Sequence, residues 1–323
     1  MSDLVIQVDD LVKTYRKAAV PAVAGVSFVV RSGEFFALLG PNGAGKTTTI
    51  SVLTTTLVPT AGSVRVAGHD VVRDAAEVRR RVGIIFQQPS LDLNLTGEQN
   101  VRLHAILYGL APYRPSYRAM PVSYRTTVGQ LAELLGIGGA IFSPVRTLSG
   151  GMKRKLEILR SLLHRPEVLF LDEPTAGLDP VSRRDLWTYL RQVQRESGTT
   201  VFLTTHYLEE AEHADQVCVI ARGRVVAEGS PSALTQRLVG RSTVVLDGPD
   251  RTALAQALEA CGAVVTGGPP FEVVGDAAEV QRVISAVDVP LSLVRTHVAT
   301  LEDAYLDIVG AERDAERAEV AVG

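Results

Sequence analysis

The sequence predicts an α/β protein built around a parallel β-sheet, followed by a smaller α+β domain. Short apolar runs rich in Val, Ile and Phe recur up to about residue 229, and helical stretches such as SRRDLWTYLRQVQRES (182–197) separate some of them. Two runs, VLFL at 168–171 and TVFL at 200–203, are apolar throughout, as in strands that are buried on both faces. The pattern changes after residue 240, which indicates the second domain.

The first part of the chain contains eight strand-like segments, most of them bounded by Gly or polar residues. They read LVIQV, VSFVV, FFALL, SVRVAG, VGIIFQ, VLFLDE, TVFLTTH and VCVIARGRVVAEG. Residues 89–165 lack convincing strands and contain three segments with helical spacing: EQNVRLHAILYGL, VGQLAELLGI and GMKRKLEILRSLL. We expect these residues to form a helical insertion in the sheet domain. The stretch APYRPSYRAMPVSYR (111–125) contains three prolines and is expected to be irregular.

The second part of the chain has a different order of elements. We expect strand 242–246, helix 250–261, strands 263–266 and 271–274, helix 277–287, strand 291–296 and a last helix over about 300–309. The order β-α-β-β-α-β predicts a small ferredoxin-like domain. The expected domains are therefore residues 1–235, residues 241–310 and a flexible tail over 311–323.

Composition excludes several kinds of protein. The net charge of −3 gives no reason to expect a nucleic-acid partner. No run reaches the roughly 18 apolar residues of a membrane span, and the start MSDLVIQVDD lacks the basic and apolar parts of an export signal. Two cysteines provide no disulfide framework. We therefore expect a cytoplasmic protein.

The segment LLGPNGAGKTTTI (38–50) has the features of a phosphate-binding turn. Gly40, Gly45, Lys46 and Thr47 fit the pattern G-x-x-x-x-G-K-[ST], with a strand before it and a helical segment after it. The glycines allow backbone N–H groups to converge, and the helix N-terminus adds positive potential. Lys46 is expected to reach the β- and γ-phosphates, and the Thr47 hydroxyl to bind Mg²⁺. A coincidental turn is the alternative interpretation of this motif taken alone.

Two further segments fit a nucleotide site. The strand VLFL ends in Asp172 and Glu173, which beside a phosphate turn would bind Mg²⁺ and activate or orient an attacking water, respectively. In TLSGGMKRKLEIL (147–159), Ser149 is a good helix N-cap, and Gly150 and Gly151 permit a close backbone approach. The basic run 153–155 is expected to add local positive charge.

These segments together resemble the ATPase subunit of an ATP-binding cassette (ABC) transporter. GPNGAGKTT resembles the Walker A loop, LSGGM the family signature, LFLDEP the Walker B strand and GLDP the loop that follows it, all in family order within residues 1–230. The resemblance implies a P-loop NTPase (RecA-like) sheet with an N-terminal antiparallel β part. It extends the nucleotide-binding set to the whole loop and the residue after it: Gly40, Pro41, Asn42, Gly43, Ala44, Gly45, Lys46, Thr47 and Thr48.

The resemblance also implies roles for three residues that no local pattern singles out. Tyr15 lies where the family stacks an aromatic ring on adenine, although a tyrosine at a strand end is common in itself. Gln87 matches the glutamine that contacts Mg²⁺ and the attacking water, with Gln88 as an alternative one residue later. His206 matches the switch histidine that holds the γ-phosphate and water beside Glu173. Met152 departs from the family pattern, which most often has glutamine there.

The family assembles two cassettes head to tail, so that Ser149, Gly150 and Gly151 of one copy cover ATP on the other. The resemblance therefore implies a homodimer, or a pair with a related chain, bound to separate membrane permease subunits at the inner face of the cell membrane. DLNLTGEQNVRLHAILYG and TLEDAYLDIVG are similar to the daunorubicin-resistance branch of exporters of drugs, lipids or polysaccharides. The alternatives are a soluble ABC ATPase of translation or DNA repair, an importer ATPase, and a P-loop kinase or GTPase, although no Asn-Lys-x-Asp motif is present. The cargo is not encoded in these motifs.

Overall fold

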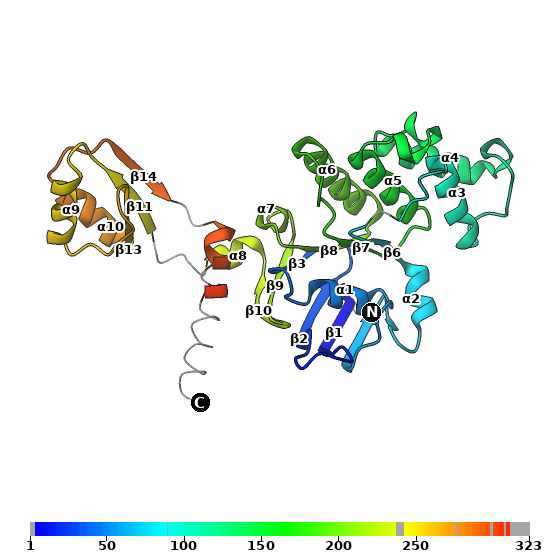
Figure 1. Ribbon diagram of the computed structural model, residues 1–323, viewed down its shortest axis with the longest axis horizontal. Coiled ribbons are helices and arrows are strands. Elements are labelled where there is room, and N and C mark those ends of the chain that lie inside the picture. Colours follow the sequence, from blue (N-terminus) through cyan, green and yellow to red (C-terminus); the bar gives the residue numbers. More distant parts are fainter. Residues whose placement is uncertain are drawn as a thin grey trace. The chain divides into compact units, whose positions relative to one another are not determined.

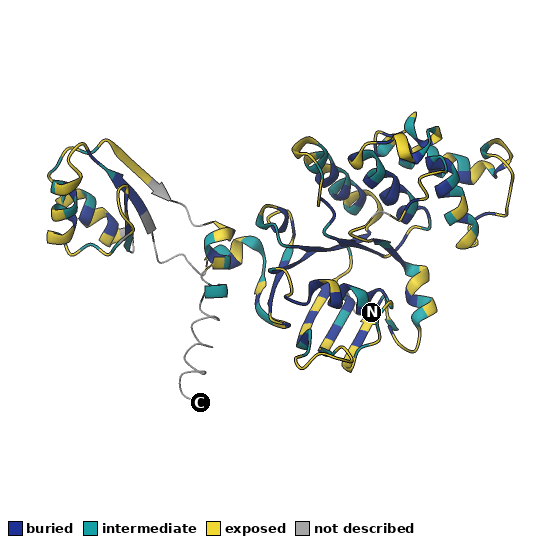
Figure 2. Ribbon diagram, viewed as in Figure 1, coloured by how far each residue is buried: buried dark blue, intermediate teal, exposed yellow. Residues whose placement is uncertain are grey.

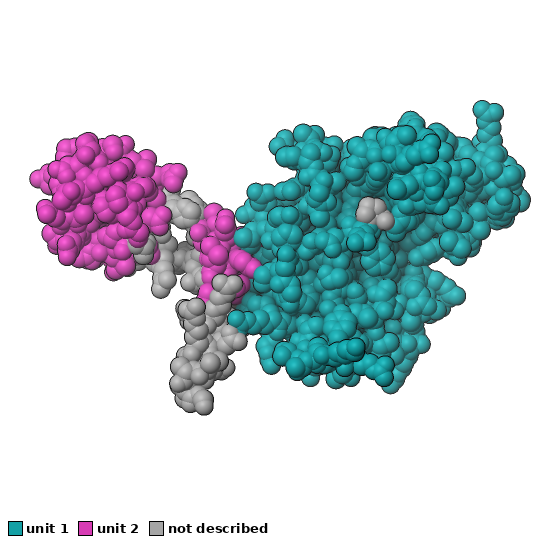
Figure 3. All heavy atoms as spheres, in the orientation of Figure 1, with its two compact units in different colours: residues 1–228 teal, residues 229–323 magenta. Residues whose placement is uncertain are grey.

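The structure of the chain is a computed structural model (Figure 1). It describes residues 4–88, 90–236, 242–275, 277–297, 300–306 and 308–310. The chain consists of two compact units. The first unit comprises residues 1–228 and the second residues 229–323 (Figure 3). The expected tail over 311–323 lies outside the described residues.

A six-stranded sheet forms the centre of the first unit, with the order β10-β9-β3-β8-β7-β6. Strand β3 (Phe35–Leu39) pairs in parallel with β8 (Thr200–Thr205) and β9 (Gln216–Ala221), and β7 (Val168–Asp172) pairs in parallel with β8 and β6 (Val82–Ile85). Every residue of β3, β7 and β8 is buried, which confirms the expectation from the continuous apolar runs VLFL in β7 and TVFL in β8. Strand β10 (Arg224–Gly229) forms one edge.

A second, four-stranded sheet faces the first, with the order β2-β1-β4-β5. It consists of β2 (Val23–Arg31), β1 (Leu4–Lys13), β4 (Ala61–Val66) and β5 (His69–Asp70), and β1 pairs antiparallel with both β2 and β4. The strands of both sheets contain many buried residues (Figure 2), and the core between the sheets is apolar. Phe36 stacks on Phe28 of β2 and on Phe202 of β8, with ring centroids 5.3 and 5.2 Å apart.

Helices complete the first unit. α1 (Lys46–Leu53) follows β3, α2 (Ala75–Arg81) precedes β6, and α6 (Pro180–Ser197) and α7 (Leu208–Ala211) flank β8 in sequence. The expected helical insertion between β6 and β7 contains α3 (Gly97–Leu107), α4 (Val122–Leu134) and α5 (Gly150–Leu162). α5 and α6 lie on the face of the six-stranded sheet opposite β1 and β2, and α3 and α4 pack against α5 (Figure 1). No helix in the described residues is long and apolar enough to cross a bilayer.

The proline-rich stretch of the insertion is only partly irregular. A short 3₁₀ turn spans Tyr117–Ala119, but α4 begins at Val122, directly after Pro121. The prediction of irregular structure was therefore wrong for residues 122–125. Pro121 precedes the first helical residue, where a missing N–H costs nothing, so it starts the helix rather than breaking it.

The second unit contains a four-stranded sheet with the order β12-β13-β11-β14. Its elements follow the expected order: β11 (Ser242–Asp247), α9 (Arg251–Ala260), β12 (Val265–Thr266), β13 (Phe271–Gly275), α10 (Ala277–Ala286) and β14 (Leu293–His297). Residues 301–306 and 308–310 are helical, and a short α8 (Pro231–Gln236), which the sequence analysis did not predict, precedes β11. Val244 and Leu246 of β11 pack with Leu254 and Leu258 of α9 in its core.

Candidate functional site

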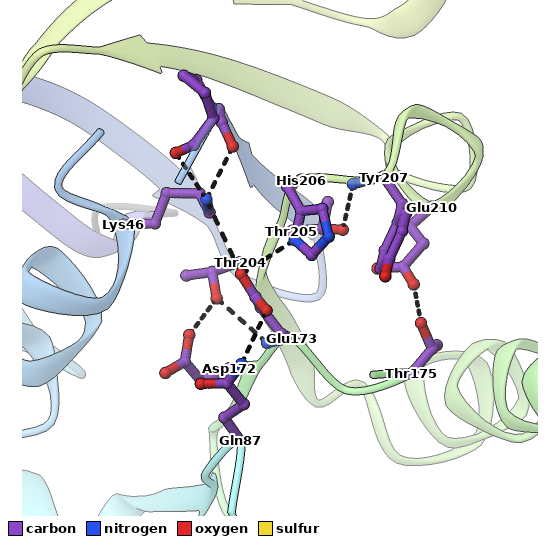
Figure 4. Close-up of polar contacts among 12 residues, drawn as sticks. Lys46, Gln87, Asp172, Glu173, Thr175, Thr204, Thr205, His206, Tyr207 and Glu210 are labelled. Atoms are coloured by element: carbon purple, nitrogen blue, oxygen red, sulfur yellow. Dashed lines mark hydrogen bonds and ion pairs between the residues drawn. The ribbon is translucent and has the colours of Figure 1, made fainter. Parts of the chain in front are cut away.

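The candidate site lies where three parallel strands end at the same edge of the sheet (Figure 4). β3 leads into the loop that begins at Gly40, β7 ends at Asp172, and β8 leads to His206. The strand register aligns Leu39 with Thr205 and Asp172 with Thr204. Side chains that are more than a hundred residues apart in sequence are thereby brought together.

The loop 40–45 holds Lys46 in a buried position. Lys46 is 5% exposed, and its Nζ donates to the carbonyl oxygens of Gly40 at 2.7 Å and Pro41 at 3.0 Å. Gly45 has a φ of 105°, and a Cβ on Gly40 would lie 2.2 Å from the carbonyl oxygen of Ile220. The loop therefore requires glycine at both positions, for conformational and for steric reasons. Burial lowers the pKa of Lys46, and the nearby carboxylates of Glu173 and Asp172 oppose that shift.

Asp172 is a buried acid at the end of β7. It is 4% exposed and accepts a hydrogen bond from the Thr204 hydroxyl. Burial raises the pKa of its carboxyl group, while hydrogen bonds from Thr204 and Thr47 and the charge of Lys46 lower it. A carboxylate and a hydroxyl within hydrogen-bonding reach of each other are hard oxygen donors of the kind that Mg²⁺ prefers, and Mg²⁺ needs few protein ligands. Thr47 and Asp172 therefore fit the expected metal site.

Glu173 is the centre of the polar cluster. Its Oε2 accepts from Gln87 Nε2 at 3.0 Å, and its Oε1 lies 3.1 Å from His206 Nδ1 and 3.9 Å from Lys46 Nζ. Its backbone has a φ of 45°, and its N–H donates to the Thr204 carbonyl at 3.1 Å. The contact identifies Gln87, rather than its neighbour Gln88, as the glutamine that reaches Glu173. The structure thus brings together Lys46, Gln87, Glu173 and His206.

Tyr15 lies beside the same loop. Its hydroxyl and the Thr48 hydroxyl are 3.1 Å apart, and the ammonium group of Lys13 lies 5.9 Å from the ring centroid. Tyr15 remains 44% exposed, so part of the residue is open to a ligand close to α1. That position fits the expected stacking of an aromatic base.

The segment at Ser149 lies outside the Glu173 cluster. Ser149 caps α5, as expected, by accepting from the Met152 N–H at 3.2 Å. A Cβ on Gly151 would lie 2.6 Å from Ser182 Oγ, so glycine allows α5 to pack closely on α6. Among the described contacts, none joins Ser149, Gly150 or Gly151 to the loop at Lys46.

We expected residues 153–155 to add positive charge near the start of α5. This expectation was wrong at Arg154, because its side chain points into the protein. Arg154 is 7% exposed and donates to the carbonyl oxygens of Phe86 at 2.7 Å and Pro174 at 2.9 Å, and to Glu157 Oε2 at 3.0 Å. Sequence reasoning missed these contacts. A signal was present, since Glu157 lies among consecutive apolar residues of α5 and therefore requires a buried partner.

Comparison with known proteins agrees with this geometry. The family model described as "ABC transporter" matches residues 23–176. The chain is 38% identical to the daunorubicin resistance ATP-binding protein DrrA3 of Streptomyces coeruleorubidus, covering 98% of this chain and 100% of that protein. It is also 38% identical to the Nod factor export ATP-binding protein I of Paraburkholderia xenovorans, covering 97% and 99%, respectively.

Two solved structures have the same fold. One is cbiO1 of Clostridium perfringens, part of the ABC transporter complex cbiONQ, with 29% identity, a TM-score of 0.64 and coverage of 72% of this chain and 91% of that chain. The other is the dimeric post-hydrolysis state of the ATP-binding cassette MJ0796 bound to ADP and Pi, with 26% identity, a TM-score of 0.61 and coverage of 70% and 98%. The relatives, the fold and the cluster around Glu173 together show that the chain belongs to the ABC family of transporter ATPases.

Proposed function

We propose that this chain binds Mg²⁺–ATP and hydrolyses it to drive export of a small molecule through a separate membrane permease. The cluster of Lys46, Gln87 and His206 around Glu173 is the observation that carries the proposal, because each group has a defined use in phosphoryl transfer. Export is favoured because the relatives matched over nearly the whole chain are named for daunorubicin resistance and Nod factor export.

ATP would bind across the loop 40–45 and the start of α1. Lys46 already points into the loop, where two carbonyl oxygens hold its ammonium group. Phosphate oxygens carry more negative charge than carbonyl oxygens, so Lys46 would exchange these partners for the β- and γ-phosphates. Tyr15 would stack on adenine, and Thr48 would hold its hydroxyl.

Thr47 and Asp172 would hold Mg²⁺, with Gln87 close by through its contact with Glu173. When bound, the ion supplies positive charge that neutralises the phosphate oxygens. The hydrogen bond from Thr204 fixes the orientation of the Asp172 carboxylate whether or not the ion is present.

Hydrolysis would be carried out by Glu173. Its carboxylate would accept a proton from the attacking water at Oε1 or Oε2, or orient that water towards the γ-phosphate. Gln87 and His206 contact one carboxylate oxygen each, which fixes the plane of the group before substrate arrives. His206 would also hold the γ-phosphate in line with the water.

A second copy would complete the site. Ser149, Gly150 and Gly151 lie apart from Lys46 in one chain, so we infer that this helix N-terminus covers the γ-phosphate bound to a partner copy. Loss of the γ-phosphate on hydrolysis then lets the two copies separate. Permease subunits would dock on the helical insertion near Gln87, which would place the protein at the inner face of the membrane. We also infer that the second unit is a ferredoxin-like accessory domain over about 241–310, from its strand order.

The proposal is tested by measuring ATP binding and hydrolysis by the purified chain and by its Lys46→Ala variant. We expect the wild type to bind and hydrolyse ATP and the variant to lose binding. Arg80→Ala, which removes an exposed cation on α2 that pairs with Glu77, is the matched control and should leave binding unchanged. An unchanged affinity in Lys46→Ala would contradict the proposed site. Copurification with a permease of several membrane spans distinguishes a transporter from a soluble ATPase, and the direction of cargo movement in inverted vesicles distinguishes an exporter from an importer.

A further inference from the structure

A buried acid outside the catalytic cluster, Glu210, lies four residues after His206 in α7. Its side chain is 0% exposed. Burial raises the pKa of its carboxyl group, and only part of that shift is offset by hydrogen bonds from Thr175 and Thr205 and by the charges of Arg183 and His206. A carboxyl group in such a place costs free energy, so its presence requires an explanation beyond filling space.

The partner of Glu210 comes from the segment that follows β7 and carries Glu173. The Thr175 hydroxyl donates to Glu210 Oε1, and Thr175 is itself fully buried. Thr175 follows Glu173 by two residues, whereas Glu210 belongs to the segment that carries His206 (Figure 4). The second oxygen, Oε2, has no hydrogen-bond partner, so Thr175 holds the carboxyl group through Oε1.

The hydrogen bond between Thr175 and Glu210 is one of several contacts that join the segment of Glu173 to the segment of His206. On one side, the N–H of Glu173 donates to the Thr204 carbonyl at 3.1 Å. On the other side, Thr175 is tied to Glu210, and between these two links His206 Nδ1 lies 3.1 Å from Glu173 Oε1. Glu173 adopts a φ of 45°, a sparsely populated conformation that persists only where the surroundings fix it.

We propose that Glu210 is a positioning residue for ATP hydrolysis: by accepting from Thr175 it fixes the backbone after Glu173 relative to the segment that carries His206. The inference rests on the proposed function, because it assigns Glu210 to the same reaction. Glu210 would act through the placement of Glu173 and His206 rather than directly on ATP or on the attacking water.

Purely structural packing is the rival explanation. A side chain that only fills space would affect folding and ATP binding together with turnover. A positioning residue affects turnover selectively, because ATP is held by the loop at Lys46, which forms no hydrogen bond or ion pair with Glu210 among the described residues. The two explanations therefore differ in how kcat, KM and thermal stability change relative to one another.

The experiment compares variants at both ends of the bond. Glu210→Ala and Thr175→Val remove the acceptor and the donor, whereas Glu210→Gln and Thr175→Ser keep them. Glu209→Ala is the matched control, since that neighbouring side chain is 83% exposed and lies 3.7 Å from Arg183 in a loose ion pair. kcat, KM, the Kd for ATP and Tm are measured for each protein.

We expect Glu210→Ala and Thr175→Val to lower kcat by about 10- to 100-fold, as misplacement of catalytic groups does, with the Kd for ATP changed less than about twofold. The double variant should be no slower than the worse single variant, because both changes break one bond. Glu210→Gln and Thr175→Ser should keep kcat within about threefold, since an amide oxygen still accepts and a serine hydroxyl still donates.

Three results would overturn the inference: a kcat of Thr175→Val equal to wild type, additive losses in the double variant, or losses of kcat matched by equal losses of ATP affinity. If Glu210→Ala fails to fold, Thr175→Val and the two conservative variants still decide the question. If the wild type itself binds no ATP, the proposed function fails instead, so the two failures are distinguishable.

Discussion

Replacement of Glu173 by glutamine tests the centre of the site most directly. The amide has nearly the same size as the carboxylate, so the contacts with Gln87 and His206 can be kept if Gln87 or the new amide presents its other terminal atom. The change removes a negative charge and the capacity to accept a proton from water. We therefore expect an intact fold with almost no turnover.

The expected magnitudes follow from the contacts of Glu173. Loss of a general base slows a reaction by about 10²- to 10⁴-fold, which is roughly 3–5 kcal/mol in activation free energy. Without ATP, Lys46 Nζ lies 3.9 Å from Glu173 Oε1. Across that distance two charges attract by about 4 kcal/mol at an effective dielectric constant of about 20, before desolvation is counted. The variant lacks this attraction and also lacks repulsion between Glu173 and phosphate, so its ATP affinity should equal or exceed that of the wild type.

The assay combines single-turnover hydrolysis, equilibrium ATP binding and the sedimentation of the protein with saturating ATP. Glu167→Gln is the control, because Glu167 lies just before the opposite end of β7, in an exposed ion pair with Arg81. Glu173→Gln should accumulate an ATP-bound dimer that the wild type forms only transiently. A rate loss below about tenfold would refute the assignment of Glu173 as base. A variant that stays monomeric with ATP, beside a wild type that turns over as a monomer, would refute the two-copy mechanism.

Three further predictions concern the same unit. Gly40→Ala should abolish ATP binding, because its Cβ would meet the Ile220 carbonyl oxygen, whereas Gly129→Ala, with no atom within 4 Å, should bind normally. Asp172→Asn should raise the Tm of the nucleotide-free protein and lower kcat. Burial raises the pKa of Asp172, so the stabilising contribution of its protonated form is lost as pH rises through the folded-state pKa. At about pH 7 the charged carboxylate therefore destabilises the fold. His104→Phe should reduce the loss of unfolding free energy at acid pH. Burial lowers the pKa of His104 to about 4, so the wild type loses stability as pH drops from 6.5 towards 4, by about 2 kcal/mol at pH 5. Urea unfolding at about pH 5 and about pH 7.5 measures this difference.

Local patterns in the sequence were sufficient for much of the fold. The continuous apolar runs of β7 and β8 predict strands buried on both faces, and the loop at Lys46 has a fixed spacing of glycines. The extent of β1 is different. Its expected part, LVIQV, ends at Val8, but the strand continues to Lys13 through an irregular register at Val8 to Leu11, which hides the alternation of side chains.

Contacts between distant charged residues were not predictable in the same way. Arg154 and Glu210 are charged residues on helices, and such residues usually face solvent. Both are buried, because their partners come from strand ends that the sheet places beside them. Periodicity reports which face of a helix is apolar, but it does not report which loop lies against that face. The resemblance supplied Gln87 and His206, whereas Arg154 and Glu210 required the assembled sheet.

Arg154 shows how these hidden contacts join the parts of the site. Its guanidinium group holds the Phe86 carbonyl, one residue before Gln87, and the Pro174 carbonyl, one residue after Glu173. Arg154 belongs to α5, the helix that begins at Gly150. Breaking these bonds would leave N–H groups of a buried guanidinium without acceptors, at a cost of about 1–3 kcal/mol or more. α5 therefore cannot shift along the sheet without moving Gln87 and Glu173, so the helix proposed to sense ATP on a second copy is tied to the groups that hydrolyse ATP in its own.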